Sequence, residues 1–326
     1  MVTIKDVAKR AGVAISTVSY ALNNSKSLKP ETVMKVKEAV KELGYRPNLI
    51  ARSLKTRSTS TIGVIIPDIA NTFFAQIIRG IEDVSERKNH SVILCNTYEN
   101  PKKEENYIDL LLNRDIDGLI LVGTGHNPET LTGKEDLPIV IVDRQLGQSV
   151  PSVTVNNRKG GYLATQHLLE KKSGEILFLS GPLGINTYLE RLNGYLDALN
   201  EAGIPRHENL IRECGVNYDG GQDVMSDIME KNLKFDSVFA SNDLIALGAY
   251  NILIRKGIRV PQDIQIIGYD DIPTSHIVTP GLSTIRQPTY HMGKTSAEIL
   301  FDIISGGSTV DEHIVLEPTL IPRETT

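Results

Sequence analysis

Polar and aromatic side chains recur in this 326-residue chain at the points where short apolar runs end. A carboxylate accepts hydrogen bonds from adjacent hydroxyls, a guanidinium group donates to them, and amides do both. Aromatic rings can cover the apolar C–H face of the same ligand. This chemistry is typical of a site for a polyhydroxylated molecule such as a sugar. The candidate ligand-binding residues are Asn71, Phe73, Phe74, Asp143, Arg144, Arg191, Tyr218, Asn242, Asp270 and Gln287.

Each candidate also has an ordinary structural explanation. Asp143 and the arginine after it could form a solvated ion pair at the end of a strand. The two adjacent phenylalanines could be plain core residues, and Asn242 could serve only as a helix cap. Arg191 could lie on a solvated helix face. The coincidence of all these side chains at the ends of strands favours a binding site.

The segments that must position these residues alternate between two patterns from residue 61 onwards. Short β-branched runs predict buried parallel strands at 62–66, 91–95, 118–122, 139–142, 175–179, 237–240 and 264–267. Helical periodicity predicts helices at 74–88, 102–114, 159–170, 188–202, 220–231 and 242–256. The alternation predicts two doubly wound α/β lobes, in which ligands bind outside the carboxyl ends of the strands. We therefore expect the candidates to converge on a cleft between the lobes.

The first part of the chain has a different pattern. Thr3 and Asp6 fit a capping box, so a first amphipathic helix is expected to begin at Ile4. Gly12 allows a turn with positive φ before a second short helix, and Pro30 opens a third helix that Gly44 closes. The pattern predicts a helix-turn-helix, although a glycine turn between short helices also occurs in inert helical bundles.

Charge separates this head from the body. Residues 1–60 hold twelve Lys and Arg and four acidic residues, a net charge of +8, whereas the whole chain is −5 and the remainder therefore −13. A basic head on an acidic body is typical of a protein that places only its first domain on phosphates. The outward face of the second helix then presents Ile15, Ser16, Ser19 and Tyr20 as candidates for reading base edges.

Several motifs, in the same order, resemble those of the LacI/GalR family of bacterial transcription regulators. They lie at residues 4–13, 17–19, 43–48, 51–54, 63–68, 71–74, 240–243, 268–272 and 284–288. The resemblance covers essentially the whole chain, and the body is also similar to periplasmic sugar-binding proteins. It implies a small all-α helix-turn-helix head plus an α/β body of two doubly wound parallel-sheet lobes, like that of a periplasmic binding protein.

The same resemblance implies the division of the chain. Residues 1–46 are expected to form the DNA-binding domain, 47–59 a hinge helix and linker, and 60–326 an effector-binding and dimerisation domain. Its lobe 1 is expected at about 60–157 and 288–316, and lobe 2 at about 158–287 and 317–326. Leu54 would then be an apolar wedge between base steps in the minor groove, the alternative being an ordinary linker residue that packs on the body.

The residues expected to contact DNA are Thr3, Ile15, Ser16, Thr17, Ser19, Tyr20, Asn23, Asn48, Ala51, Arg52 and Leu54. Tyr20 stands where the family commonly has arginine, so the operator is expected to differ from the usual family site. Ala14 and Lys29 stand where the family has serine helix caps.

The candidate cleft residues look most like the ribose-binding branch of these proteins. Tyr218 stands where that branch commonly has phenylalanine, which keeps an aromatic wall but adds a hydroxyl. A purine, another metabolite or a phosphorylated partner protein remains an alternative effector. The resemblance leaves open whether the effector releases or recruits DNA.

Other classes of function receive little support from the sequence. The seven histidines and two cysteines show no metal-ligand spacing, and Gly123-Thr-Gly125 lacks the third glycine of a dinucleotide fingerprint. We predict no cofactor, no metal and no enzymatic activity, although Asp270, Asp271 and His276 are conceivable as a catalytic cluster. No apolar run approaches the ~20 residues of a membrane span, and the first residues lack an apolar signal core. A cytoplasmic location is therefore expected. The basic head and the missing signal core both argue against a transport binding protein.

The sequence therefore predicts a DNA-binding transcriptional regulator that is controlled by a small sugar between two lobes. The family resemblance implies that it is a repressor. Because each head would bind one half-site, a homodimer on a near-palindromic operator is expected. No leucine-heptad tail follows the body, so a tetramer is not expected.

Overall fold

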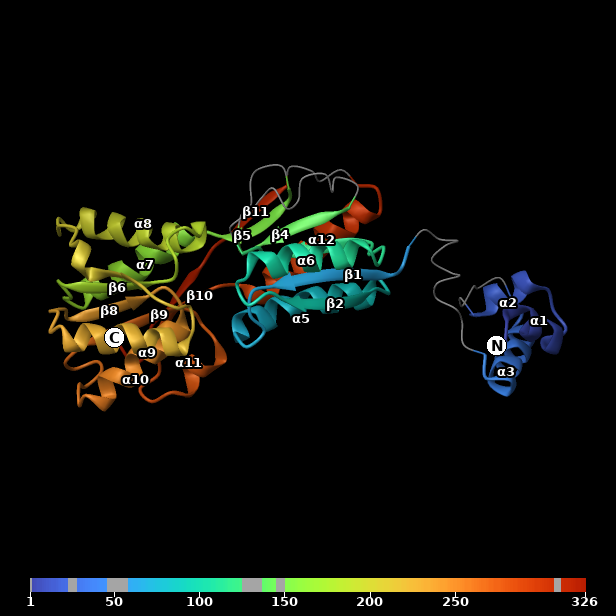
Figure 1. The fold of residues 1–326 in the computed structure, drawn as a ribbon, viewed down its shortest axis with the longest axis horizontal. Helices are drawn as coiled ribbons and strands as arrows, with labels where there is room; N and C mark the ends of the chain where they lie inside the picture. Colours follow the sequence, from blue (N-terminus) through green and yellow to red (C-terminus); the bar gives the residue numbers. More distant parts are fainter. Residues whose placement is uncertain (1, 23–27, 46–57, 125–136, 145–149, 308–311) are drawn as a thin grey trace. The chain divides into compact units, whose positions relative to one another are not determined.

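The computed structural model describes residues 2–22, 28–45, 58–124, 137–144, 150–307 and 312–326. The chain divides into two compact units, Met1–Thr59 and Ser60–Thr326 (Figure 1). The first unit has a small core of its own, and the second unit contains two β-sheets.

The described residues of the first unit form α1 (Ile4–Ala11), α2 (Ile15–Leu22) and α3 (Pro30–Leu43). The carboxylate of Asp6 accepts hydrogen bonds from the backbone N–H (2.9 Å) and the hydroxyl (2.7 Å) of Thr3, which fixes the start of α1. Gly12 ends this helix at φ 67°, a left-handed conformation that glycine adopts without a Cβ clash. The three helices bury Val7, Ala8, Val18, Ala21, Val36 and Ala39 against one another.

Lobe 1 of the second unit contains a six-stranded parallel sheet in the order β11-β5-β4-β3-β1-β2. The strands are β1 (Thr61–Ile66), β2 (Ser91–Asn96), β3 (Gly118–Leu121), β4 (Ile139–Val142), β5 (Ser152–Val155) and β11 (His313–Leu316). The helices are α5 (Thr72–Arg87), α6 (Pro101–Leu112) and α12 (Thr289–Ile304). In β1, Ile62 and Val64 share a core with α5 and α12, whereas Ile65 packs with Leu111 of α6. The period of two along the strand thus covers both faces of the sheet.

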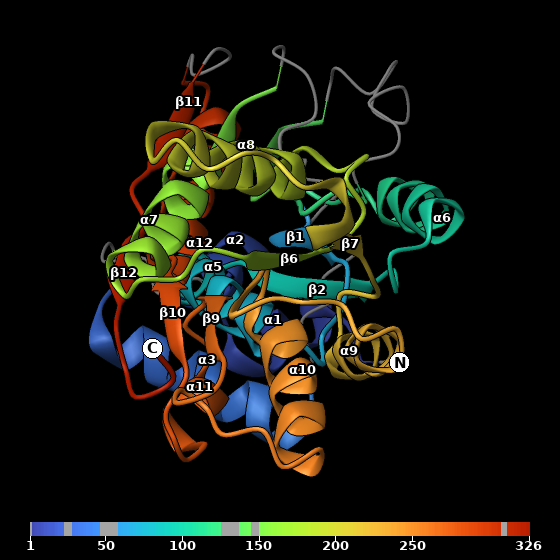
Figure 2. The ribbon, with the colours of Figure 1, turned by 90° about the vertical axis from the view of Figure 1, so that its left-hand side faces the viewer.

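Lobe 2 contains the second six-stranded sheet, in the order β12-β10-β9-β8-β6-β7. Its strands are β6 (Ile176–Ser180), β7 (Ile211–Glu213), β8 (Ser237–Ala240), β9 (Gln265–Asp270), β10 (Ser283–Arg286) and β12 (Thr319–Ile321). The helices are α7 (Asn157–Glu170), α8 (Asn186–Glu201), α9 (Tyr218–Glu230), α10 (Asp243–Arg255) and the short α11 (Pro273–Ile277). Figure 2 shows this sheet between the α7–α8 pair and the α9–α10 pair. Only β12 runs antiparallel to its neighbour β10 within the described strands of the two sheets.

The chain passes from one sheet to the other at three described places: between β5 and α7, between β10 and α12, and between β11 and β12. The two lobes are thus built from interleaved segments. We expect these three short connections to act as the hinge when the angle between the lobes changes.

Glycines let the helices that cover the sheets cross in close contact. A Cβ on Gly293 of α12 would lie 1.9 Å from the carbonyl oxygen of Ile77 in α5. The same happens between α7 and α8, where a Cβ on Gly161 would lie 2.1 Å from the carbonyl oxygen of Arg191. Any side chain at these positions would push the helices apart, so the absence of one fixes their spacing.

The predicted fold class, a helix-turn-helix head and two doubly wound parallel-sheet lobes, is confirmed. The sequence-based assignment missed β5, β7, β10, β11, β12, α11 and α12. Most of the missed strands have only three or four residues, and β7, β11 and β12 lie at sheet edges. Their half-exposed sequences lack the buried β-branched runs by which the central strands are recognised.

Asp243 joins the start of α10 to the turn after β9, to α11 and to β10. Its carboxylate, which is fully buried, accepts hydrogen bonds from the Thr284 hydroxyl (2.6 Å), the Ser275 hydroxyl (2.7 Å) and the Ile272 N–H (2.9 Å). Burial raises the pKa of this carboxyl from 3.8 to about 7, against the opposing effect of the three hydrogen bonds.

We expect Asp243→Asn to remove one component of the pH dependence of stability. The folded state holds the Asp243 proton between about pH 4 and 7, whereas the unfolded state has released it, so this group stabilises the fold less as pH rises through that window. The shift corresponds to a change on the order of 4 kcal/mol. Urea unfolding from pH 4 to 8 measures this effect. The free energy of unfolding of wild type minus that of the variant should fall as pH rises.

Asp263→Asn is the matched control, because the exposed Asp263 titrates at about 2 in the folded protein and does not titrate in this window. The raised pKa would be contradicted if the free energy of unfolding of wild type minus that of Asp243→Asn stays constant from pH 4 to 7.

Candidate functional site

Two adjoining pockets between the lobes of the second unit collect most of the predicted ligand-binding residues. The larger has a volume of about 280 Å³, and the smaller lies deeper in the cleft. Both are lined by Asn71, Phe74, Arg144, Tyr188 and Asn242. The deeper pocket adds Phe73, Asp143, Thr187, Arg191 and Asp270. Parallel strands bring these residues together because their carboxyl ends share one edge of each sheet.

Asp143 follows β4 and is 5% exposed. Its φ of 69° lies in the left-handed region, which is uncommon for a residue other than glycine and occurs often at functional sites. One carboxylate oxygen, Oδ1, has no hydrogen-bond partner among the described residues. Burial raises the pKa of the carboxyl, although the guanidinium groups of Arg144 and Arg191 oppose the shift.

Arg144 is 4% exposed and donates both terminal nitrogens to Glu99, with Nη1–Oε2 and Nη2–Oε1 distances of 2.7 Å each. Nη1 also donates to the carbonyl oxygen of Gly123 at 3.2 Å. The remaining nitrogen, Nε, lies 3.9 Å from Asp143 Oδ2 and makes no hydrogen bond within the described part of the chain. The alternative of a solvated pair at residues 143 and 144 is therefore wrong, because both side chains are buried.

Arg191 extends from α8 into the lobe 2 side of the cleft and is 3% exposed. Its Nε donates to Asn157 Oδ1 at 2.9 Å, and its Nη1 donates to the backbone carbonyl of Ser241. The guanidinium carbon lies 3.7 Å from the centre of the Tyr269 ring, so the two groups form a cation–π contact. A solvated helix face is thus excluded for this residue.

Asp270 ends β9 at φ 114° and is 7% exposed. Its Oδ1 accepts a hydrogen bond from Gln287 Nε2 at 2.7 Å and lies 3.9 Å from Arg191 Nη1. Burial raises the pKa of this carboxyl well above its usual value, with Arg191 opposing the shift. The amide oxygen of Gln287 is buried and accepts no hydrogen bond from any described residue.

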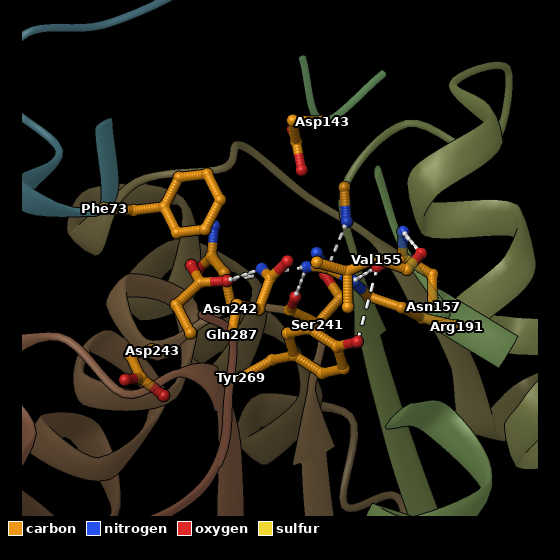
Figure 3. A network of polar contacts seen from close by, with 12 residues as sticks. Phe73, Asp143, Val155, Asn157, Arg191, Ser241, Asn242, Asp243, Tyr269 and Gln287 are labelled. Carbon is orange, nitrogen blue, oxygen red and sulfur yellow. Dashed lines mark hydrogen bonds and ion pairs between the residues drawn. The ribbon is translucent and has the colours of Figure 1, made fainter. Parts of the chain in front are cut away.

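Asn242 has two roles in the structure. Its Oδ1 accepts a hydrogen bond from Ile245 N–H at 2.7 Å and caps α10, while its Nδ2 donates to the carbonyl oxygen of Val216 at 3.0 Å. The side chain also lines both pockets, so capping and exposure to the cleft are compatible. In Figure 3, Asp143 and Phe73 of lobe 1 point towards Arg191, Asn242 and Gln287 of lobe 2.

The aromatic side of the cleft differs from the prediction at one position. Phe73 and Phe74 are buried with their ring centres 5.0 Å apart, and both belong to the core as well as to the pocket lining. Tyr218 lines neither pocket and is 37% exposed at the start of α9. Tyr188, which is 6% exposed, is the tyrosine of lobe 2 that lines both pockets.

Gln287, like Tyr218, lines neither pocket. The lining residues that the sequence-based prediction missed are Tyr98, Glu99, Thr187, Tyr188, Val216 and Asn217. Tyr188 lies three residues before Arg191 on α8, so helical spacing alone places the two on one face. Glu99 follows β2, and the same rule of strand ends that selected Asp143 would have selected it.

The predicted DNA-contacting residues of the head have different exposures. Thr3, Ile15, Ser16 and Tyr20 are exposed, with Ile15 at 45% and Tyr20 at 55%, whereas Thr17 and Ser19 are half-buried. The other predicted contacts lie outside the described residues: Asn23, Asn48, Ala51, Arg52 and Leu54.

The described residues contain no group of three or more His, Cys, Asp or Glu side chains that could hold a metal ion. Within the same residues, no helix has both the length and the apolar character needed to cross a membrane.

Comparison with known protein families assigns both units. Residues 3–48 match the family described as bacterial regulatory proteins, lacI family. Residues 59–324 match the family of periplasmic binding proteins and sugar binding domain of LacI family.

Full-length relatives are regulators. The chain is 42% identical to the HTH-type transcriptional regulator RegA of Clostridium acetobutylicum over 99% of this chain and 98% of the relative. It is 35% identical to the ribose operon repressor of Halalkalibacterium halodurans, over 100% and 97%. It is 38% identical to the transcriptional repressor PurR of Vibrio atlanticus, over 100% and 98%.

Solved structures agree with these relatives. The Lac repressor dimer bound to operator and an anti-inducer matches with a TM-score of 0.88 and 27% identity, over 100% of this chain and 99% of that chain. A LacI-family regulator from Enterococcus faecium with bound ribose matches with a TM-score of 0.74 and 29% identity, over 82% and 98%. The chain therefore belongs to the LacI family of DNA-binding transcriptional regulators and combines a helix-turn-helix head with a ligand-binding domain.

Proposed function

We propose that this LacI-family repressor responds to a small neutral sugar, a ribose-like pentose, that binds between the two lobes and controls the affinity of a homodimer for its operator. The observation that carries the proposal is the set of unpaired polar atoms in the cleft. Asp143 Oδ1 is an acceptor without a donor, and Arg144 Nε is a donor without an acceptor, among the described residues, and both side chains line the cleft.

A hydroxyl group fits this arrangement, because it donates one hydrogen bond and accepts others. One hydroxyl of a pentose can donate to Asp143 Oδ1 while it accepts from Arg144 Nε. A second can donate to the carboxylate of Asp270 on the opposite lobe, which lines the same pocket. Buried polar atoms without hydrogen-bond partners cost free energy. A ligand that forms hydrogen bonds with them therefore gains affinity.

The apolar lining supports the same class of ligand. Phe73 and Phe74 from lobe 1 and Tyr188 from lobe 2 can cover the C–H faces of a sugar ring. Among the relatives and neighbours, one is named a ribose operon repressor and another contains bound ribose. Relatives named PurR make a purine the second candidate, and the binding assay below includes it.

The ligand contacts both lobes in this proposal, so its binding favours one angle between them. The three connections at residues 155–157, 286–289 and 316–319 would absorb the movement. In a homodimer on a near-palindromic site, that movement would change how the two segments predicted as hinge helices meet on DNA. The sugar is thereby coupled to the operator without touching it.

Reading of the operator is assigned to α2. Ile15, Ser16 and Tyr20 project from its exposed side, while Val18 and Ala21 hold its other side in the core of the head. The exposure of Tyr20 supports a base-reading role for this side chain in the proposal.

We expect Asp143→Asn to weaken the binding of sugar without weakening the fold. The substitution removes a buried carboxylate whose charge is costly, and asparagine tolerates the left-handed φ at this position. The lost charge-assisted hydrogen bond should reduce affinity for ribose by about 10- to 100-fold. Titration calorimetry with ribose, other pentoses, hypoxanthine and guanine measures it, and thermal unfolding checks the fold.

Asp197→Asn is the matched control, because Asp197 forms an exposed ion pair with Arg158 away from the cleft. If Asp143→Asn binds ribose with an affinity within twofold of wild type, Asp143 is not part of the binding site. If the protein binds purines and no sugar, the proposed class of ligand is wrong.

We expect Tyr20→Ala to weaken operator binding by about tenfold or more, because one base contact in such interfaces contributes 1–3 kcal/mol. The head should remain folded, since the Tyr20 side chain is 55% exposed. Fluorescence anisotropy on an operator selected from random DNA gives the affinity. Met34→Ala, which truncates a 63% exposed side chain on α3, serves as the control and should bind normally. Equal affinities of the two variants would exclude Tyr20 from the reading face.

A further inference from the structure

Glu99 lines the larger pocket and holds the arginine that a ligand must reach. Its two carboxylate oxygens bind Nη1 and Nη2 of Arg144, both at 2.7 Å, in a bidentate pair. The Glu99 side chain is 30% exposed, whereas that of Arg144 is 4% exposed, so the carboxylate covers the guanidinium group from the solvent side. A third hydrogen bond to Gly123 leaves Arg144 with few free donors.

The loop that carries Glu99 is held at both ends. Thr97 N–H donates to the carbonyl oxygen of Ile66 in β1 at 3.0 Å. Asn100 caps α6 by accepting hydrogen bonds from the N–H groups of the two lysines that follow Pro101. Between them, Tyr98 and Glu99 both adopt left-handed backbone conformations, at φ 55° and 56°. Consecutive residues other than glycine in this region are costly, and the loop adopts them to place the Glu99 carboxylate.

Acidic side chains outnumber basic ones along the two pockets. Four carboxyl groups line them, on Asp68, Glu99, Asp143 and Asp270. Two guanidinium groups, on Arg144 and Arg191, oppose them, and the described lining contains no lysine. A phosphate ester would need the donors of Arg144 that Glu99 occupies, and its own charge would lie beside that carboxylate. Like charges placed together in a binding site disfavour binding, so the Glu99 carboxylate opposes the entry of a phosphate.

We propose that Glu99 is a specificity-determining residue that restricts the cleft to uncharged hydroxylated effectors and excludes phosphorylated ones. The inference rests on the proposed sugar-binding function and specifies its ligand class. Glu99 neutralises Arg144 through the two Nη atoms and leaves Nε for a hydroxyl. A neutral pentose can thus bind beside the Glu99–Arg144 pair, whereas a phosphate must displace Glu99 from it.

The test compares ribose and ribose 5-phosphate on the full-length protein by titration calorimetry. Wild type should prefer ribose by about 100-fold or more. Glu99→Gln keeps the size of the side chain and removes its charge, so its affinity for ribose 5-phosphate should rise by about tenfold or more relative to wild type. Glu105→Gln, on the exposed side of α6, makes the same charge change and should leave both affinities unaltered.

A second isosteric pair controls for folding. Glu99→Asn tolerates the left-handed backbone and lacks the charge, whereas Glu99→Asp retains it, so only the asparagine variant should gain affinity for the phosphate ester. Unchanged affinity of both uncharged variants for ribose 5-phosphate would overturn the role of Glu99, as would a wild-type protein that prefers the phosphate ester. If wild type binds no neutral sugar, the proposed function fails. The affinity of the uncharged variants for ribose 5-phosphate then still tests whether Glu99 excludes phosphorylated ligands.

Discussion

Burial of charge between the two lobes is the constraint on which the ligand-binding domain depends. Asp143, Arg144, Arg191 and Asp270 are each less than 8% exposed, and burial raises the pKa of both carboxyls. Such groups are tolerated only where partners are positioned for them. Glu99, Asn157, Ser241 and Gln287 supply some of these partners, and the atoms that remain unpaired define what the cleft can bind.

The scaffold explains how the charged groups are kept in place. Buried parallel strands deliver Asp143 and Asp270 with backbone conformations that the neighbouring strands enforce. Close crossing of α7 and α8 at Gly161 fixes the backbone of Arg191, and the Tyr269 ring supports its guanidinium group. Asp243 hydrogen-bonds the start of α10 to the turn after β9, to α11 and to β10. Packing therefore determines geometry at the cleft, while unsatisfied hydrogen bonds and charge determine the chemistry.

Much of the fold followed from local patterns in the sequence. Thr3, Asp6 and Gly12 specify the ends of α1 through short-range hydrogen bonding and backbone freedom, and buried β-branched runs specify the central strands. Edge strands such as β7 and β12 carry no such signal because tertiary pairing rather than composition creates them. Most of the cleft residues could be selected because strand ends share an edge.

The exceptions at the cleft depended on three-dimensional information. Tyr218 and Tyr188 both lie near the start of a helix, and only the packing of α8 and α9 decides which ring faces the pockets. Glu99 could have been considered from its place after β2, but its bidentate pairing with Arg144 depends on two consecutive left-handed residues that the sequence does not reveal.

The central claim is that a sugar between the lobes controls the operator affinity of the head. The most direct measurement is the dissociation constant of the full-length protein for an operator selected from random DNA, with and without saturating ribose. Coupling predicts a change of at least about fivefold, matched by an equal change in ribose affinity when operator is present, because the coupling free energy is reciprocal. An operator affinity that does not change, although calorimetry shows ribose bound, would contradict the account.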